Sequence, residues 1–481
     1  MSAAASHHHA PHATVAWKRP ERDGPTKRAA RLAARIADEV IADGWPVGEM
    51  LGSAGELTKR YDVSRAVFRE AVRILEHQQV VRTRRGSMGG LFVSEPTLDA
   101  ITDAAVLYLH RLDTTVREVF EARMLLEAIA TELAARRLAR GGRTRLRAHL
   151  AGERSGDITD PHVLHELLAT LSGNPALELF VHILDRVSLL YMRDDLAVDA
   201  QTIASASRAH RRIVDAVLAR DDAAAGRHMR RHLEAEWRFL EQRHATRPMM
   251  STNAALASAS AGKRAEVVAR EIYLGVVAGH LTSGTYLGSE PDLLARHGVS
   301  RAVFREAVRL LEHHDVAAMR RGTGGGLYVA APSPEAVTDV VALYLARRGT
   351  GLPAVAELRV RVEESLVDLV IDGLDDDGAA ALDQAAELDE GAEQSAEAVH
   401  DLHTAMAALA GNRALELVAL VLIRLTRFRQ TRPLTDEAKV EIGRDVHRSH
   451  VAIVRSIRVG DRDRARSRMR RHLDALAAFL D

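Results

Sequence analysis

Residues 63–73 read VSRAVFREAVR, and residues 299–309 read VSRAVFREAVR again, 236 positions later. The likeness extends outward from these stretches: MRRHL occurs at 229–233 and returns at 469–473. The offset between the copies therefore drifts only from 236 to 240 over the length of the repeat. A period this long indicates two copies of a two-part protein, not a solenoid of short repeats.

The repeated stretch predicts a short helix with two different sides. Ser64 is a suitable N-cap, and Val67 and Ala71 fall on one apolar side. Arg65 and Arg69, spaced by four residues, fall in one row on the other side. A shorter helix and a tight turn precede it, an order typical of a helix-turn-helix whose second helix enters the major groove of DNA.

A glycine-rich hairpin with arginines is predicted after each of these helices. It contains Arg85-Gly86 in the first copy and Arg321-Gly322 in the second. Such arginines can reach phosphates or the minor groove. A solvated amphipathic helix followed by a turn is the simpler interpretation of the arginine row alone, but the whole ordered set, present twice, favours DNA binding.

The overall composition excludes some classes of protein. The chain has 481 residues and no Cys, which excludes disulfides and thiolate metal sites. No apolar run is long enough to predict a membrane span. The 66 basic and 66 acidic residues give zero net charge, yet residues 26–96 and 263–332 are mildly basic, and local patches govern binding to phosphate.

These patterns predict a mainly α fold with two winged helix-turn-helix domains and two helical bundles of six or seven helices each. The predicted divisions are a tail, a winged domain and a helical domain, then a linker and a second pair of domains. Their bounds are 1–25, 26–96, 97–245, 246–262, 263–332 and 333–481.

The helical segments contain histidines at matching places. Two of them lie 22 residues apart in each copy, with a helix, a tight turn and a second helix between them; a third lies nine residues before the Asn of LSGNP or LAGNR. Three histidines from three helices can form an open site for Zn or Ni, whose vacant position a carboxylate can take. The alternative is a set of hydrogen-bonded core histidines. The two sets are His165, His210 and His232, and His403, His450 and His472.

The string VSRAVFREAVR, followed by LEH and the glycine-rich hairpin, resembles the DNA-binding domain of GntR-type bacterial regulators. The resemblance implies DNA contacts from the helix and from the wing. One customary arginine of the preceding helix is replaced by Gly55 and Pro291. The implied contacts are Ser64, Arg65, Arg69, Arg85 and Gly86, and Ser300, Arg301, Arg305, Arg321 and Gly322.

The histidine arrangement resembles the FCD effector domain of the FadR subgroup of this family. The aspartate that the family places before the first histidine is missing; His162 and His400 lie nearby as alternative fourth ligands, and so does Asp160 in the first copy. The resemblance also implies that Arg123 and Arg359 face the effector. Surface salt bridges with neighbouring glutamates are the alternative for both arginines.

The resemblance implies a cytoplasmic, nucleoid-associated bacterial regulator, in most cases a repressor, controlled by a small organic acid or acyl compound. Such regulators act as homodimers on near-palindromic half-sites of double-stranded DNA. The duplication leads us to expect that one chain acts as a pseudo-dimer, with a homodimer of chains as the alternative. A metal-dependent hydrolase of a small carboxylate and a chromosome-binding protein of low specificity are the competing functions.

Overall fold

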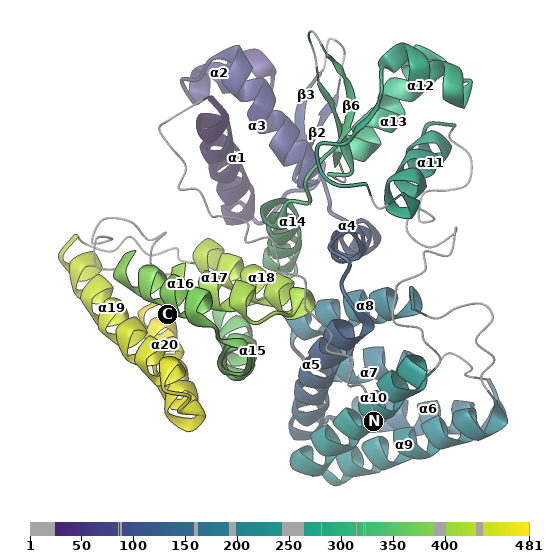
Figure 1. Ribbon diagram of the computed structural model, residues 1–481, viewed down its shortest axis with the longest axis vertical. Coiled ribbons are helices and arrows are strands. Elements are labelled where there is room, and N and C mark those ends of the chain that lie inside the picture. Colours follow the sequence, from purple (N-terminus) through teal and green to yellow (C-terminus); the bar gives the residue numbers. More distant parts are fainter. Residues whose placement is uncertain are drawn as a thin grey trace, which may run out of the picture.

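The computed structural model describes residues 25–84, 86, 89–157, 162–191, 199–242, 264–279, 281–313, 315–320, 322, 324–388, 401–429 and 436–480. Figure 1 shows two small domains at one end of the molecule and two helical bundles at the other. The predicted linker and all but the last residue of the predicted tail lie outside the described residues. The predicted fold class, mainly α with small β wings, is confirmed.

The first winged domain has three helices and a three-stranded antiparallel sheet in the order β1-β3-β2. Ser53 and Glu56 form a reciprocal capping box that starts α2. Ser64 caps α3, as the sequence predicts. Between the two helices Asp62 adopts a φ of 50°, which makes the turn tight. The elements are α1 (Pro25–Ala42), β1 (Met50–Gly52), α2 (Ala54–Arg60), α3 (Arg65–His77), β2 (Val81–Arg84) and β3 (Gly90–Val93).

The second winged domain repeats this plan with sheet order β4-β6-β5. Its tight turn has Gly298 with φ of 59° at the place of Asp62. Phe304 and Leu311 of α13 are buried in its core, as Phe68 and Leu75 are in the first. The elements are α11 (Arg264–Ala278), β4 (Tyr286–Gly288), α12 (Glu290–His297), α13 (Arg301–His313), β5 (Ala317–Arg320) and β6 (Gly326–Val329).

The first helical domain contains seven helices among its described residues. Asn174 caps α8, and Pro175 follows at the first helical position, where its missing N–H leaves no bond unmade. Arg220, with φ of 60°, turns the chain between α9 and α10. The helices are α4 (Leu98–Arg111), α5 (Val116–Arg136), α6 (Arg140–Ser155), α7 (Val163–Leu171), α8 (Pro175–Leu189), α9 (Ala200–Ala219) and α10 (Asp222–Gln242).

The second helical domain has the same seven helices among its described residues. Its long helices α15 and α20 pack together as α5 and α10 do in the first domain. None of the helices that the structure describes is both long and apolar enough to cross a membrane. The helices are α14 (Pro334–Arg347), α15 (Leu352–Gly373), α16 (Asp376–Leu388), α17 (Asp401–Leu409), α18 (Arg413–Arg429), α19 (Asp436–Arg458) and α20 (Arg462–Leu480).

The two halves of the chain pack crosswise. Leu107 of α4, from the first half, belongs to the core of the second winged domain, and Leu343 of α14 belongs to the core of the first. Two side-chain hydrogen bonds follow the same pattern: Gln78 Nε2 donates to Asp339 Oδ2 at 3.0 Å, and the Tyr273 hydroxyl lies 3.1 Å from His110 Nδ1. Each winged domain is therefore held by the helix that follows the other one.

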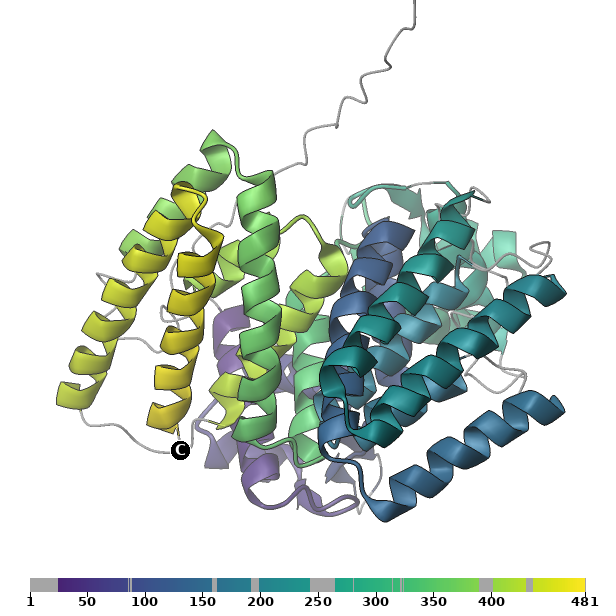
Figure 2. The ribbon, with the colours of Figure 1, turned by 90° about the horizontal axis from the view of Figure 1, so that it is seen from below.

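The two helical bundles also meet directly and lie side by side in Figure 2. One hydrophobic core runs through both of them. The paired asparagines of the GN motifs reach across: Asn174 Nδ2 donates to Ala354 O at 2.9 Å, and Asn412 Nδ2 donates to Glu118 O at 3.1 Å. The four domains thus form a single body with approximate twofold repetition.

Candidate metal centres and nucleic-acid interface

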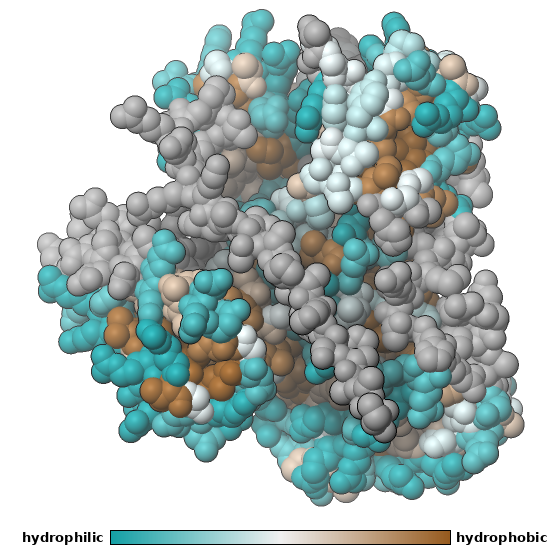
Figure 3. Space-filling view, viewed as in Figure 1, coloured by the Kyte–Doolittle hydropathy of each residue, from teal (hydrophilic) through white to brown (hydrophobic). Residues whose placement is uncertain are grey.

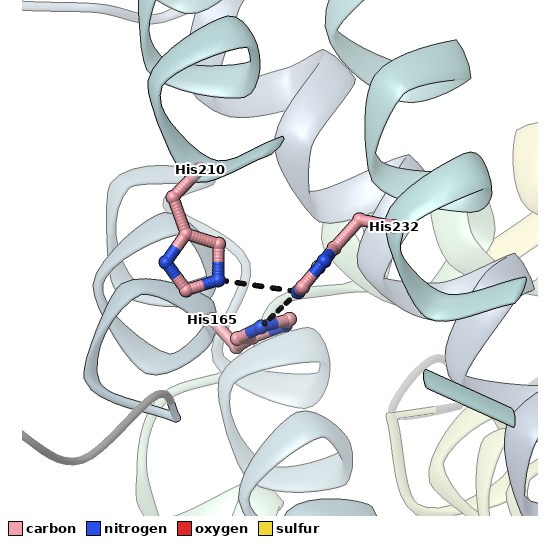
Figure 4. Close-up of side chains that lie close together, drawn as sticks. All are labelled: His165, His210 and His232. Carbon is pink, nitrogen blue, oxygen red and sulfur yellow. Dashed lines mark hydrogen bonds between the residues drawn. The ribbon is translucent and has the colours of Figure 1, made fainter. Parts of the chain in front are cut away.

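Three helices of the first bundle bring the predicted histidines together. His165 comes from α7, His210 from α9 and His232 from α10, and all three side chains are buried. His232 Nε2 lies 3.1 Å from His210 Nε2 and 3.3 Å from His165 Nε2. Figure 4 shows the three rings pointing toward one common centre. This is the donor arrangement of an open three-histidine metal site.

The second bundle repeats this arrangement. His472 Nε2 lies 3.1 Å from His403 Nε2 and 3.0 Å from His450 Nε2. The three residues come from α17, α19 and α20, and all are buried. The sequence spacing therefore located two histidine triplets correctly.

Carboxylates behind the histidines fix which nitrogen faces the centre. His210 Nδ1 donates to Glu153 Oε1 at 2.5 Å, and His403 Nδ1 donates to Glu363. Burial raises the pKa of Glu363, but His403 and Arg359 outweigh it and hold the value at about 2, so this group is a carboxylate. Glu and Asp carboxylates in this position orient a metal-binding imidazole and leave its Nε2 lone pair toward the ion.

Burial also keeps imidazoles of both triplets neutral. It lowers the pKa of His403 to about 4 and that of His450 to about 3. In the first bundle burial lowers the pKa of His232, and burial together with Arg123 lowers that of His165 well below its usual range. Neutral imidazole is the form that binds metal. Nε2 atoms gathered at about 3 Å, with the Nδ1 atoms of His165, His210 and His403 on carboxylates, fit a divalent cation.

The two arginines assigned to the effector site are buried, not at the surface. Arg123 is fully buried and Arg359 is 3% exposed, so the alternative of surface salt bridges is wrong. Each does pair with the glutamate four residues on: Arg123 Nε with Glu127 Oε1 and Arg359 Nε with Glu363 Oε1, both at 2.6 Å. These glutamates also contact His165 and His403, so each arginine is one carboxylate away from a histidine triplet.

Two acidic residues around Arg123 and His232 were missed from the sequence. Asp185 Oδ1 lies 2.9 Å from Arg123 Nη2, and it also accepts from His162 Nδ1 at 3.2 Å. Glu236 lies one helical turn after His232, with its Oε1 3.6 Å from His232 Nε2. The His-x-x-x-Glu spacing could have revealed Glu236, whereas Asp185 has no local signal because it comes from another helix.

The predicted fourth ligands have different outcomes. His162 lies at the start of α7 beside Asp185 and outside the group formed by the three histidine nitrogens. His400 and Asp160 lie outside the described residues. His149 and Glu153 form a further cluster with His210, because His149 Nε2 lies 3.0 Å from Glu153 Oε1.

The predicted DNA-reading helices present their arginines to solvent. Arg65 and Arg69 are exposed on α3, and Ser64 uses its hydroxyl to cap this helix. On α13 the equivalent arginines face an acid: Arg301 Nε and Arg305 Nε lie 3.3 and 3.4 Å from Glu290 Oε1. Hydrophilic side chains cover much of the outer surface of both winged domains in Figure 3. Ser300, like Ser64, accepts from a backbone N–H in the first turn of its helix.

The wings are antiparallel hairpins, as predicted. The Arg84 guanidinium lies 4.4 Å from the centre of the Phe92 ring, and that of Arg320 lies 4.2 Å from the Tyr328 ring, so each arginine lies along its hairpin. Gly86 and Gly322, with φ of 119° and 98°, form the turns. The predicted contacts Arg85 and Arg321 lie outside the described residues.

Comparison with known proteins agrees with this architecture. The description "Bacterial regulatory proteins, gntR family" matches residues 28–93, and "FCD domain" matches residues 118–235 and 354–475. The HTH-type transcriptional repressor NanR of Escherichia coli is 26% identical over 225 residues, which cover 45% of this chain and 84% of NanR. The Uxu operon transcriptional regulator of Escherichia coli is 34% identical over 104 residues, 22% of this chain and 39% of that protein.

Solved structures include Streptococcus agalactiae GntR, which is 24% identical and aligns with 44% of this chain and 99% of its own, with a TM-score of 0.33. The matched families and relatives are transcription regulators, which confirms the prediction that the chain is not an enzyme. The FCD description matches twice, which confirms the tandem duplication. The chain belongs to the GntR family of bacterial transcriptional regulators and carries an FCD domain in each half.

Proposed function

We propose that one chain works as a pseudo-dimer that represses transcription from near-palindromic operators and releases them when a small organic acid or acyl compound binds. The observation that carries this proposal is the crosswise packing of α4 and α14, which ties two winged domains into one body. A homodimeric regulator obtains the same pairing from two chains. The division into winged domains 26–96 and 263–332 and helical domains 97–245 and 333–481 is part of the proposal.

The identical helix sequences support half-sites of nearly identical sequence. Arg65 and Arg69 would read bases in one half-site and Arg301 and Arg305 in the other, because arginine side chains bind guanine edges in the major groove. The helix N-termini at Ser64 and Ser300 would bind backbone phosphates. The wing residues Arg85-Gly86 and Arg321-Gly322 complete the proposed interface. NanR, named a repressor, supports the sign of regulation.

Sedimentation of the complex together with footprinting tests the pseudo-dimer. One chain should protect two half-sites on a single operator. The matched variants Arg69→Ala and Arg305→Ala should each weaken protection of one half-site and leave the other. A complex that holds two chains per operator, or a single chain that protects one half-site, would contradict the proposal.

The histidine triplets are proposed to bind a divalent metal, Zn or Ni, which would offer a carboxylate a coordination position. The neutral, carboxylate-backed imidazoles support this assignment. Effector binding at this position would shift the relative placement of the winged domains, which is a linkage between distinct sites. The proposed place of action is the bacterial cytoplasm, on the nucleoid.

Metal analysis of purified protein tests the assignment. The double variant His210→Ala/His232→Ala should lose the metal of the first bundle, and His450→Ala/His472→Ala that of the second. His182→Ala is the matched control, because this partly buried histidine of α8 pairs with Glu166 and belongs to neither triplet. Unchanged metal content in both double variants would refute the assignment.

A further inference from the structure

The two candidate metal centres differ in the acids that surround them. Six residues after the shared GNxALEL segment, the place of Asp185 in the first bundle is taken by Ile423 in the second. Three residues after the shared MRRHL segment, the place of Glu236 is taken by Leu476. Both replacements exchange a carboxylate for an aliphatic side chain that is buried in the second bundle.

In the first bundle Glu236 bridges the arginine and the histidine triplet. Its Oε2 lies 3.5 Å from Arg123 Nη1, while its Oε1 lies 3.6 Å from His232 Nε2. The carboxylate therefore occupies the position that an effector carboxylate would need in order to contact both a bound metal and the arginine. Asp185 neutralises the remaining face of Arg123 at 2.9 Å.

In the second bundle this position has no carboxylate among the described residues. Arg359 pairs with Glu363, which is shared with His403, and its Nη1 donates to Thr426 Oγ1 at 3.4 Å. Arg359 Nη2 is buried and donates to no acceptor in the described part of the chain. Arg123 Nη2 makes no hydrogen bond either, but the Asp185 carboxylate lies 2.9 Å from it as an ion-pair partner, and Arg359 Nη2 has no such carboxylate among the described residues. A buried guanidinium nitrogen without an acceptor is costly, and an anion would relieve that cost.

The balance of buried charge also distinguishes the two centres. In the first bundle a divalent ion and Arg123 would face the three carboxylates Glu127, Asp185 and Glu236, which balance them. In the second, a divalent ion and Arg359 would face Glu363 alone among the described contacts. A buried excess of positive charge is unfavourable unless an anion compensates it.

We propose that the two centres have divided their roles: Glu236 closes the first as a built-in carboxylate ligand, and the second is the open centre that takes a carboxylate from solution. The inference rests on the proposed metal binding and goes beyond it by assigning the response to one half of the chain. The first centre would then stabilise its bundle without sensing the effector. Arg359 and the metal in the second centre would hold the two ends of the same carboxylate group.

Cobalt-loaded full-length protein allows each centre to be tested alone, with acetate as the probe. His450→Ala leaves Co²⁺ only in the first centre, and His210→Ala leaves it only in the second. Acetate should change the visible Co²⁺ spectrum of His210→Ala and leave that of His450→Ala unchanged. Glu236→Leu, added to His450→Ala, should make the first centre respond. Leu476→Glu, added to His210→Ala, should abolish the response of the second.

The outcomes separate this inference from the metal assignment on which it rests. If neither single-centre protein takes up Co²⁺, the metal assignment itself fails, and the division of roles fails with it. If both bind Co²⁺ and both respond to acetate, the metal assignment stands and the division is wrong. A response of His450→Ala that is the same with and without Glu236→Leu would also overturn it. Circular dichroism of each variant is the control that the fold is intact.

Discussion

Replacing Asn412 by Ala should weaken the contact between the two halves of the chain. Asn412 is 2% exposed. Its Oδ1 accepts from Leu415 N at 3.0 Å and so caps α18, while its Nδ2 donates to Glu118 O at 3.1 Å and to Glu121 Oε2 at 3.0 Å in α5. One side chain thus both starts a helix in the second half and ties it to the first.

The expected loss of stability is the sum of the contributions of these contacts. Loss of a helix cap costs about 1 kcal/mol. Each hydrogen bond to the other half contributes roughly 0.5–1.5 kcal/mol, with the bond to the Glu121 carboxylate at the upper end. Asn412→Ala should therefore lower the free energy of unfolding by about 2–4 kcal/mol, by the same estimates. Asn412→Ser keeps a capping oxygen and should lose only the part that crosses between the halves.

Urea unfolding followed by circular dichroism measures both variants. The matched change Asn174→Ala removes the cap of α8 and a single bond to the other half, from Nδ2 to Ala354 O at 2.9 Å, so it should cost less than Asn412→Ala. If Asn412→Ser costs as much as Asn412→Ala, the bonds to the other half carry the effect in full or serine fails to cap. If Asn412→Ala costs less than the loss of a cap alone, the reasoning about bonds between the halves is refuted.

Three further changes have defined outcomes. Glu290→Ala removes the acid that faces Arg301. Operator affinity measured by fluorescence anisotropy should then rise roughly twofold to fivefold, which corresponds to the free energy of an exposed ion pair. Unchanged or weaker binding would contradict the role of that acid. Burial, with Glu118 adding to it, raises the pKa of Glu416 to about 7, so the folded state binds its proton more tightly than the unfolded state. The stability that this proton contributes is complete below about pH 4.5 and is lost as the pH rises to about 7. Unfolding temperatures across this range should fall less steeply for Glu416→Gln, and an equal slope would argue against the assignment. Gly326→Ala would place a Cβ 2.7 Å from Gly288 O across the β4–β6 pair. Thermal unfolding should show that this change destabilises the second winged domain by about 1–3 kcal/mol. A stability equal to the parent's would mean that β4 and β6 can move apart to make room for the methyl group without cost.

Local patterns were sufficient to predict the elements of the fold. Ser64 caps the helix it was expected to cap, because capping depends on residues within one turn. The crosswise packing was not predictable in this way, since Leu107 and Leu343 look like ordinary core residues and their partners lie far away in the sequence.

The candidate metal centres show the same difference: contacts set by nearby residues were predictable, and contacts between distant helices were not. Histidines 22 residues apart in a helical hairpin meet because the number of residues between them places both at the same level along the two antiparallel helices. The alternative of a surface salt bridge for Arg123 was wrong, although a glutamate four residues on is the usual sign of an exposed helical ion pair. Its second partner, Asp185, comes from α8 and could be found only once the helices were packed.

Fusion of the two halves explains why the described differences between them are possible at all. In a homodimer every substitution appears in both subunits, so a change that suits one site is imposed on the other.

In this chain Ala54 stands where the second winged domain has Glu290, and Leu476 stands where the first bundle has Glu236. The first change leaves the arginines of α3 without the acid that faces those of α13. By our proposal, the second would separate a self-liganded centre from an open one. If both differences have functional effects, the half with the freer arginines is also the half with the closed centre. Operator binding would then depend most on the first winged domain, and ligand binding most on the second bundle. The crosswise packing supplies the link between them, because α14 begins the second bundle and contributes Leu343 to the core of the first winged domain.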